Sequence, residues 1–319
     1  MLSFVRRLVA VATLALALAS GIGFFGGLSW VADLFAHFRL QLAVGLLVCV
    51  AAAWVLRQSG VALLAASCSL VNLVVVSPQL VYQPSAEARG ERTVRLVHAN
   101  VNYFNRDFES ALRFFSDADP DVLLIVEANE LWMSALAPLR ERLVYTKWVQ
   151  DGKFQIAMMS RFPMTAAGKY FSPRNPSIVA HVDAPGGELC VIGTHPRSPA
   201  SSRRARRRDQ QLASIGAFVR QQATRTVVVG DLNTTPWGHA FRAPVRDSGL
   251  RDSSRGFGFQ WSWPASFWPL GIPIDHALVS DGVNVLDRRM GPSIGSDHLP
   301  LVVDIQLTET VRGSRLPES

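Results

Sequence analysis

Residues 227–236 read VVVGDLNTTP, and residues 295–305 read GSDHLPLVVDI. Each stretch joins a run of β-branched residues to acidic, amide or imidazole side chains. The polar residues follow the run in the first stretch (Asp231, Asn233) and precede it in the second (Asp297, His298). Short apolar runs of this kind are typical of buried strands, and α/β proteins hold catalytic groups at strand ends. We therefore expect both stretches to meet at one site.

The same pattern continues outward through residues 93–307. Asn100 follows TVRLVH, Glu127 follows DVLLIV, His195 follows ELCVIGT, and Asp275 opens IDHALVS. Helix-like stretches such as RDFESALRFFSDA alternate with these runs, which predicts a mixed α/β domain with one or two sheets under helices. Taken singly, such residues are more often turn formers or caps. Together, at so many strand ends, they indicate convergence.

The first 82 residues have a different composition. Through residue 84 the chain holds four Arg, no Lys and a single acid, Asp33, whereas the rest holds 28 Lys and Arg against 24 Asp and Glu. Uncharged runs of 25, 17 and 29 residues end at Asp33, Arg57 and Glu87. Each is long enough for a bilayer core, which takes roughly 17–25 residues. We predict three transmembrane helices in 1–82, a linker at 83–92, a soluble domain at 93–307 and a polar tail at 308–319.

The first apolar run has an alternative interpretation as a cleaved signal peptide, because Arg6 and Arg7 precede it and Ala17 to Ala19 resemble a cleavage site. Cleavage would still leave two apolar runs. The arginine pair before the first helix favours a cytoplasmic N-terminus, and three crossings then place residues 93–307 outside the cytoplasm. Cys190 is the single cysteine of the soluble domain, so cysteine usage does not report the compartment.

Several segments, in this order, resemble the endonuclease/exonuclease/phosphatase superfamily. The resemblance covers essentially the whole soluble domain and implies a four-layer α/β sandwich of the deoxyribonuclease I-like type, here preceded by three transmembrane helices. The segments are HANVNYFN (98–105), PDVLLIVEAN (120–129), IAMMSRFP (156–163), GTHPRSP (193–199), VVVGDLNTTP (227–236), IPIDHALVS (272–280) and GSDHLPLVVDI (295–305).

The resemblance also implies roles for individual residues. Glu127 is similar to the family's main ligand for Mg²⁺ or Mn²⁺, with Asn100 and Asp297 beside it. Hard oxygen ligands of this kind suit those ions. His298 resembles the general base that activates water, and Asp275 resembles the carboxylate that orients it.

The remaining family positions concern the phosphate. Asp231 and Asn233 resemble the pair that positions the attacking water and bonds the phosphate oxygens, and His195 resembles the second histidine, which supports the transition state or the leaving oxygen. The sequence departs from the family at Val126, where many members carry Gln. It also has no clear counterpart of the tyrosine of apurinic-site endonucleases.

Two further features suggest substrate contacts. Five arginines within residues 203–208, among them Arg203, Arg204 and Arg207, suit a polyphosphate or anionic head groups, although a solvated helix face is an equally good interpretation. The loop FGFQWSWPASFWPLGIP (257–273) carries Trp263 among its tryptophans. These could stack on bases, lie at a membrane interface or form a hydrophobic lid.

A composition of 49% hydrophobic and 18% charged residues excludes a disordered chain. The sequence therefore predicts a hydrolase of the inner or plasma membrane: a membrane-anchored, divalent-metal-dependent phosphodiesterase that acts outside the cytoplasm. The predicted substrate is a phosphoester, either nucleic acid or a phospholipid head group, and no protein partner is predicted. The alternative is an inactive binding module with the same fold.

Overall fold

The computed structural model describes residues 1–81, 93–152, 154–172, 175–222 and 224–308. The predicted linker (83–92) and all of the predicted tail beyond residue 308 lie outside these ranges. The first 81 residues form helices, and strands begin at Thr93. The N-terminal helices are α1 (Leu2–Ile22), α2 (Trp30–Ala36), α3 (Arg39–Val55) and α4 (Ser59–Leu80), with a 3₁₀ turn, η1 (Gly23–Phe25), after α1.

The strands form two six-stranded sheets. The first has the order β11 (Val283–Met290), β12 (Leu301–Leu307), β1 (Thr93–Asn100), β2 (Val122–Val126), β4 (Phe154–Ser160) and β3 (Tyr145–Asp151). The second has the order β5 (Met164–Ser172), β6 (Asn175–Ala184), β7 (Gly187–Thr194), β8 (Arg225–Asp231), β10 (Asp275–Val279) and β9 (Arg251–Asp252).

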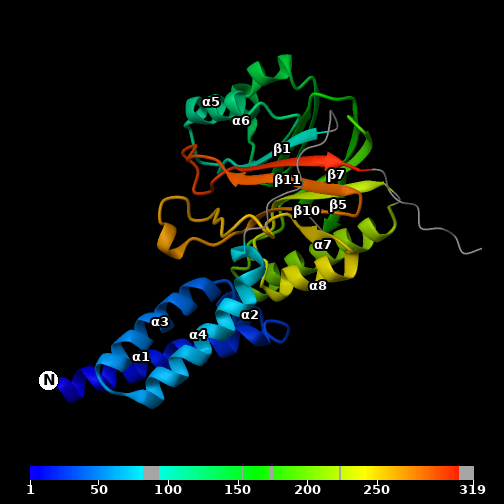
Figure 1. Cartoon of the computed structure of the whole chain (residues 1–319). Helices are drawn as coiled ribbons and strands as arrows, with labels where there is room; N and C mark the ends of the chain where they lie inside the picture. Colours follow the sequence, from blue (N-terminus) through cyan, green and yellow to red (C-terminus); the bar gives the residue numbers. More distant parts are fainter. Residues whose placement is uncertain (82–92, 153, 173–174, 223, 309–319) are drawn as a thin grey trace, which may run out of the picture.

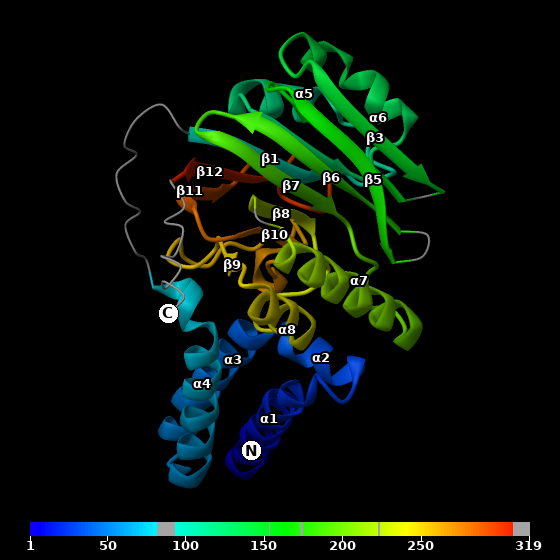
Figure 2. The same cartoon turned by 90° about the vertical axis from the view of Figure 1, so that its right-hand side faces the viewer.

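Helices cover the outer face of each sheet (Figure 2). The first sheet carries α5 (Phe108–Ala118), α6 (Glu130–Ala135) and η2 (Ala137–Glu141). The second carries α7 (Ser202–Arg220) and α8 (His239–Ser248). The loop between β9 and β10 contains η3 (Trp268–Leu270). The arrangement is thus helix, sheet, sheet, helix, the four layers that the sequence predicts.

Alternation of side chains along the strands builds this sandwich. In β1, Leu96 faces the second sheet and joins a core with Ile178 and Val227, whereas Val97 faces the opposite way and packs with Phe115 of α5. Successive strand residues point to opposite faces, so strands that are apolar at nearly every position are covered on both. The continuous apolar runs in the sequence have this cause.

Two pairs of parallel strands carry the polar residues of the predicted site at their carboxyl ends. β1 pairs in parallel with β2 in one sheet, and β7 pairs in parallel with β8 in the other. Their carboxyl ends hold Asn100, Glu127, His195 and Asp231. The second pair approaches so closely that a Cβ on Gly230 (φ +152°) would lie 1.8 Å from the carbonyl oxygen of Thr194, which explains the glycine before Asp231.

The N-terminal helices project from the side of the domain that carries α7 and α8 (Figure 1). α1, extended through η1, and α4 are each long and apolar enough to cross a membrane. α3 meets that test only together with α2, and these two helices are bent by 61°. The structure therefore offers two spans, or the three of the prediction if the bent pair counts as one.

A separate break, after residue 25, divides the first apolar run. Asp33 and Gly26 turn toward the domain, where Asp33 is buried and its carboxylate accepts the backbone N–H of His239 at 2.7 Å. Ser29 caps α2 by accepting from the backbone N–H of Val31. The first apolar run is thus divided into one long helix and one short helix that contacts the domain.

Candidate active site

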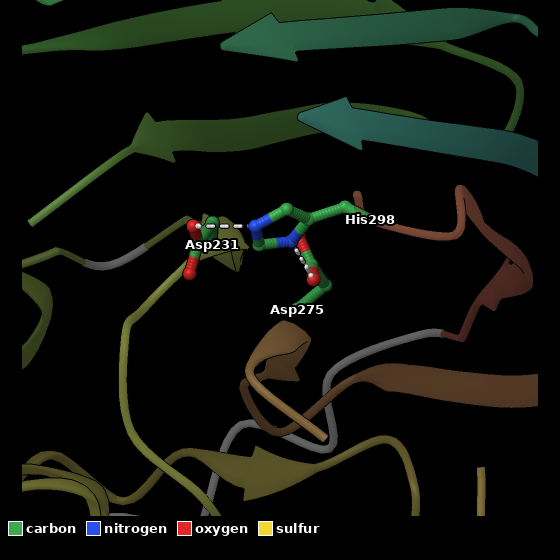
Figure 3. Close-up of side chains that lie close together, drawn as sticks. All are labelled: Asp231, Asp275 and His298. Carbon is green, nitrogen blue, oxygen red and sulfur yellow. Dashed lines mark hydrogen bonds and ion pairs between the residues drawn. The ribbon is translucent and has the colours of Figure 1, made fainter. Parts of the chain in front are cut away.

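The imidazole of His298 lies between two carboxylates (Figure 3). Its Nδ1 is 2.8 Å from Oδ2 of Asp275, and its Nε2 is 3.7 Å from Oδ2 of Asp231. The other oxygen of Asp275 is 2.9 Å from Nε2 of His98. An ionised carboxylate only accepts hydrogen bonds, so His98 and His298 both donate to Asp275. This arrangement fixes the His298 ring and turns Nε2 toward Asp231.

Asp275 is held rigidly as well as buried. Its backbone N–H and that of Ile274 both donate to Oγ of Ser262 at 3.1 Å, and the buried Arg288 donates to its carbonyl oxygen. The backbone N–H of His298 donates in turn to Oγ of Ser296. A carboxylate and an imidazole fixed in this way keep one tautomer, which is what a general base requires.

Asp231 connects the two sheets. Its Oδ2 accepts from Nδ2 of Asn100 at 3.2 Å and lies 3.4 Å from Nε2 of His195. Its Oδ1 accepts the backbone N–H of Asn233, whose side-chain amide also donates to the carbonyl oxygen of Pro196. The G-D-L-N stretch thus lies against the His195 loop.

Glu127 and Asp297 complete the acidic residues of the site. Glu127 accepts from Nδ2 of Asn100 at 3.3 Å and from the backbone N–H of Tyr103 at 2.9 Å. Asp297 accepts from the side-chain amide of Asn102 at 2.7 Å and from Nε1 of Trp263 at 3.1 Å. The donors in these four hydrogen bonds are uncharged amide, indole and backbone N–H groups.

The backbone is left-handed at three positions in this region: Asn102 (φ +57°), Glu127 (φ +62°) and Asn233 (φ +51°). Asparagine tolerates this conformation, but it is costly for glutamate. The surrounding contacts hold Glu127 there, including its backbone N–H bond to the carbonyl oxygen of Gln155. Such strain concentrates at functional sites, where it aims a side chain that an ordinary strand end would not.

The acidic surroundings raise the pKa of both site histidines. Burial alone would lower the pKa of His298, but Asp275 and Asp231 outweigh it and raise that pKa to about 10. Burial likewise opposes protonation of His195, and Asp231 and Glu127 raise its pKa nonetheless. Burial favours neutral Asp275, but the charge and hydrogen bonds of His298 and His98 hold its pKa well below the usual value. The site attracts positive charge.

These residues line one cavity of about 570 Å³. Arg197, Arg204 and Trp263 lie on its wall, and so do three residues of the N-terminal helical region, Leu34, His37 and Phe38. The full lining also includes Asn100, Glu127, Phe154, His195, Ser198, Pro199, Ala200, Asp231, Asn233, Ile272, Ile274, Asp297 and His298. A volume in this range suits a small ligand or a head group.

Most residues proposed from the sequence lie together here, and the exceptions are two of the arginines. Among the described residues that line the cavity, Arg204 represents the arginine cluster, while Arg203 and Arg207 are absent. Arg208 of the same cluster is buried and pairs with Asp33 rather than facing solvent. The arginines in the first two turns of α7 therefore point in different directions.

Sequence reasoning missed three contributors. His98 lies in the same string as Asn100 but was not singled out, because its pairing with Asp275 joins positions 177 apart in the chain. Arg197, two residues after His195, stacks 4.1 Å over the ring of Phe154 and lines the cavity. Nothing in the sequence indicated that Leu34, His37 and Phe38 line the cavity, because they lie in a region assigned to the membrane helices.

The donor set fits a divalent cation. Within the described residues, Asp231, Asp275 and His298 have ligand atoms close enough to share an ion. Both oxygens of Asp275, however, accept from buried histidines and do not line the cavity, whereas Glu127 and Asp231 do line it, so these two carboxylates are more accessible to an ion. Asn100 points its NH₂ at both of these carboxylates, and a half-turn of its amide would present Oδ1 instead. Hard oxygen donors of this kind favour Mg²⁺ or Mn²⁺.

Comparison with known families identifies the fold. Residues 97–298 match the model of the endonuclease/exonuclease/phosphatase family. The chain belongs to this family. The match spans every site residue from His98 to His298 and excludes the N-terminal helices. No curated protein matches the chain.

Solved structures with the same fold are distant in sequence. An endonuclease/exonuclease/phosphatase from Bacteroides vulgatus is 15% identical, with a TM-score of 0.57 over 68% of this chain and 100% of its own. The human Nocturnin catalytic domain with bound sulfate anion is 16% identical, with a TM-score of 0.56 over 71% and 100%. The D. rerio TDP2 complexed with single strand DNA product is 14% identical, with a TM-score of 0.55 over 68% and 100%. These likenesses show the fold alone.

Proposed function

We propose that the chain is a membrane-anchored, divalent-metal-dependent phosphodiesterase that hydrolyses phosphate esters. The observation that carries the proposal is the His298 imidazole, held by Asp275 on one side and facing Asp231 and the cavity on the other. Glu127 and Asn100 lie within the same hydrogen-bonded group. An inactive binding module would have no need of a base, an orienting carboxylate and several carboxylates that line one cavity.

Each residue has a chemical role in the proposed reaction. His298 Nε2 takes a proton from a water molecule, and Asp275 stabilises the resulting imidazolium. Asp231 and Asn233 orient the water and the phosphate, and His195 donates hydrogen-bonding support to a non-bridging or leaving oxygen. Glu127, Asn100 and Asp297 are the proposed ligands of the ion.

The ion would supply positive charge for the phosphate oxygens and, by repulsion, would lower the pKa of His298 toward the neutral range. His298 must be neutral to accept a proton, and the nearby carboxylates raise its pKa to about 10, which favours the protonated ring. Metal dependence and a working base therefore go together in this site.

We also propose that the helices anchor the chain in a membrane with the α/β domain outside the cytoplasm. The support is the apolar length of α1 and α4, a third crossing by the bent pair of α2 and α3, and Arg6 and Arg7 at the N-terminal end of α1. With the N-terminus in the cytoplasm, three crossings place the domain outside, whereas two would leave it in the cytoplasm. A reporter enzyme fused after Ser319 checks the side, because an exported reporter agrees with the proposal and a cytoplasmic one contradicts it.

The experiment that tests the proposed activity uses the full chain in detergent with bis(p-nitrophenyl) phosphate. We expect hydrolysis that requires Mg²⁺ or Mn²⁺ and stops with EDTA. Glu127→Gln should abolish it, because an amide of the same shape keeps the packing and removes the charge that holds the ion. Glu130→Gln, on the exposed first turn of α6, is the matched control and should retain activity. Full activity of Glu127→Gln at unchanged thermal stability would contradict the assignment.

A further inference from the structure

The helical region forms part of the cavity wall and does more than tether the domain. Leu34, His37 and Phe38, at the turn from α2 into α3, line the same cavity as Glu127 and His298. Leu34 and Phe38 are half-buried, so they present apolar surface to whatever occupies the cavity. Ile272 and Ile274 of the loop before β10 add to this apolar side. A substrate in the cavity therefore contacts both the catalytic residues and the helices.

Polar contacts hold this wall in place. Arg208 of α7 donates to Asp33 at 3.0 Å, and both side chains are almost fully buried. His37 Nδ1 lies 3.0 Å from Oγ1 of Thr235, and Nε1 of Trp237 donates to the carbonyl oxygen of His37 at 3.2 Å. Buried bonds between two segments fix their relative position far better than a flexible linker does. The cavity thus keeps a constant position relative to the helices.

The loop before β10 has an exposed apolar tip beside the helices. Phe267, Trp268 and Leu270 are 53%, 70% and 50% exposed. The side-chain amide of Gln41 in α3 donates to the carbonyl oxygen of Gly271 at 2.8 Å, which holds this tip next to α3. Tryptophan with an exposed apolar face is typical of the membrane–water interface. The tip lies where the helices would leave the bilayer.

The cavity has a positively charged wall and an apolar wall, which suits a lipid with a phosphate head group. Arg197 and Arg204 lie on the wall formed by the His195 loop and α7, while Leu34 and Phe38 lie on the wall formed by the helices. Neighbouring arginines 203, 204 and 207 add positive potential around Arg197. Such a cavity matches a phosphate group that is joined to an apolar chain.

We propose that the substrate is a phosphodiester carried on a lipid of the same bilayer as the helices, and that Leu34, Phe38 and the Trp268 loop guide it into the cavity. This inference rests on the proposed phosphodiesterase function. The oxygen of a water molecule bonds to phosphorus as the bond from phosphorus to one ester oxygen breaks, and one proton of the water passes to His298. The released ester oxygen takes a proton from solvent and leaves as an alcohol, and His298 returns its proton to solvent. The lipid chain stays in the membrane.

The test compares lipid and soluble substrates with the full chain reconstituted in vesicles. The vesicles contain equimolar phosphatidylcholine, phosphatidylglycerol and sphingomyelin, and the soluble probes are bis(p-nitrophenyl) phosphate and a single-stranded oligodeoxynucleotide. We expect kcat/KM for at least one of the lipids to exceed that for the oligonucleotide by about tenfold or more. Phe38→Ala and Trp268→Ala should each lower the rate on lipid about tenfold more than the rate on bis(p-nitrophenyl) phosphate.

Leu131→Ala, an exposed apolar residue of α6 on the opposite outer layer, is the control and should leave all rates unchanged. Trp268 is exposed, so its substitution separates substrate entry from folding. Turnover of the oligonucleotide without turnover of lipid would overturn the inference and leave the phosphodiesterase function standing. Lipid turnover with an unchanged ratio in both variants would overturn the guiding role. No metal-dependent turnover of any probe would overturn the phosphodiesterase function itself.

Discussion

The N-terminal helices and the α/β domain distribute their side chains in opposite ways. In the helices, large apolar residues such as Leu18, Trp54 and Leu63 are exposed, whereas Arg39 and Asn72 are buried. In the domain, leucine, valine and isoleucine fill the three cores between and outside the sheets. A helical region with this reversed pattern is suited to an apolar solvent, and the domain is suited to water.

Two of the buried polar residues of the helices, Arg39 and Asn72, are hydrogen-bonded to each other. Arg39 donates to the carbonyl oxygen of Ser20 and to the side chain of Asn72, and it lies 3.9 Å over the ring of Phe24. Polar groups buried in such surroundings are stable only when they are hydrogen-bonded. The molecule therefore has three groups of buried charged residues with their partners. Arg39 lies within the helices, the Asp33–Arg208 pair lies at the junction with the domain, and the residues around His298 form the active-site cluster.

The largest expected effect concerns the active-site cluster, where buried charge serves chemistry. His298→Ala and Asp275→Asn should each reduce kcat by roughly a thousandfold or more, because the base loses either its proton-accepting nitrogen or its orienting carboxylate. The double variant should lose far less than the product of the two single losses, since the residues act as one unit. Steady-state kinetics with bis(p-nitrophenyl) phosphate measures this.

The control for this prediction is Asp304→Asn, which removes an acidic partner of Arg95 in β1 at the far side of the sheet from the site. Its activity should equal that of the wild type once the protein is folded. Fully multiplicative losses for His298 and Asp275 would mean that they act separately. The 2.8 Å contact between them would then be structural.

The difference between the regions also explains what the sequence could predict. Strand runs ending in polar residues predicted the domain and the convergence of Asn100, Asp231 and His298, because strand periodicity and strand ends are local properties. The structure brings these three side chains within 3.7 Å of one another. Asp33 is a single acid in an apolar segment, and its partner Arg208 is 175 residues away. Nothing local in either segment specifies that pairing.

The division of the first apolar run was unpredictable for a related reason. Hydropathy reports the total length of apolar chain but not where a helix bends, and the bend depends on a contact with the domain. Arg208 appeared in the sequence as one of five arginines on a helix, although it is buried and bonds the carbonyl oxygen of Asn233 as well as Asp33. A charge cluster in sequence does not show which of its members turns inward.

The second prediction concerns the junction. Arg208 pairs with Asp33 at 3.0 Å with side chains 1% and 3% exposed, whereas Arg246 pairs with Asp247 at the same distance with 77% and 55% exposed. Asp33→Asn removes the buried counter-charge of Arg208 and leaves it only the half-exposed carboxylate of Asp209, so the cost should approach but not exceed the roughly 3–5 kcal/mol of a fully broken buried pair. Asp247→Asn breaks a solvated pair and should change stability by about 0–1 kcal/mol. Chemical denaturation in detergent measures both.

This pair of variants tests whether the contacts between the helices and the α/β domain stabilise the protein. Asp33→Asn should also lower activity, since Arg208 holds the loop that contains Asn233. If the two variants lose the same stability, the helices and the domain are independent units, and the comparison between their buried charges fails. The double variant Asp33→Asn with Arg208→Met should recover part of the stability, because it removes the unpaired charge.

The smallest expected effect is the pH dependence of the active-site pair in EDTA. The folded pKa of His298, about 10, lies above the ordinary value of 6.5, so its contribution to stability is complete below about pH 6.5 and is lost as pH rises toward 10. The pKa of Asp275 is lowered, so its contribution is present above about pH 4 and is lost in acid. The two contributions overlap between about pH 4 and pH 6.5.

Thermal unfolding of the wild type and of His298→Gln, followed by tryptophan fluorescence in detergent with EDTA, gives the measurement. The difference in Tm between the two proteins should be largest near about pH 5–6 and should shrink steadily toward pH 10. Other groups that titrate in this range are present in both proteins, so the difference isolates His298. Its neighbours that face the ring are Asp231, Asp275 and His195, and only the acids favour its protonation. A difference that stays constant with pH would mean that folding does not shift the pKa of His298, and the active-site cluster would then resemble the helices, where buried polar groups serve packing alone.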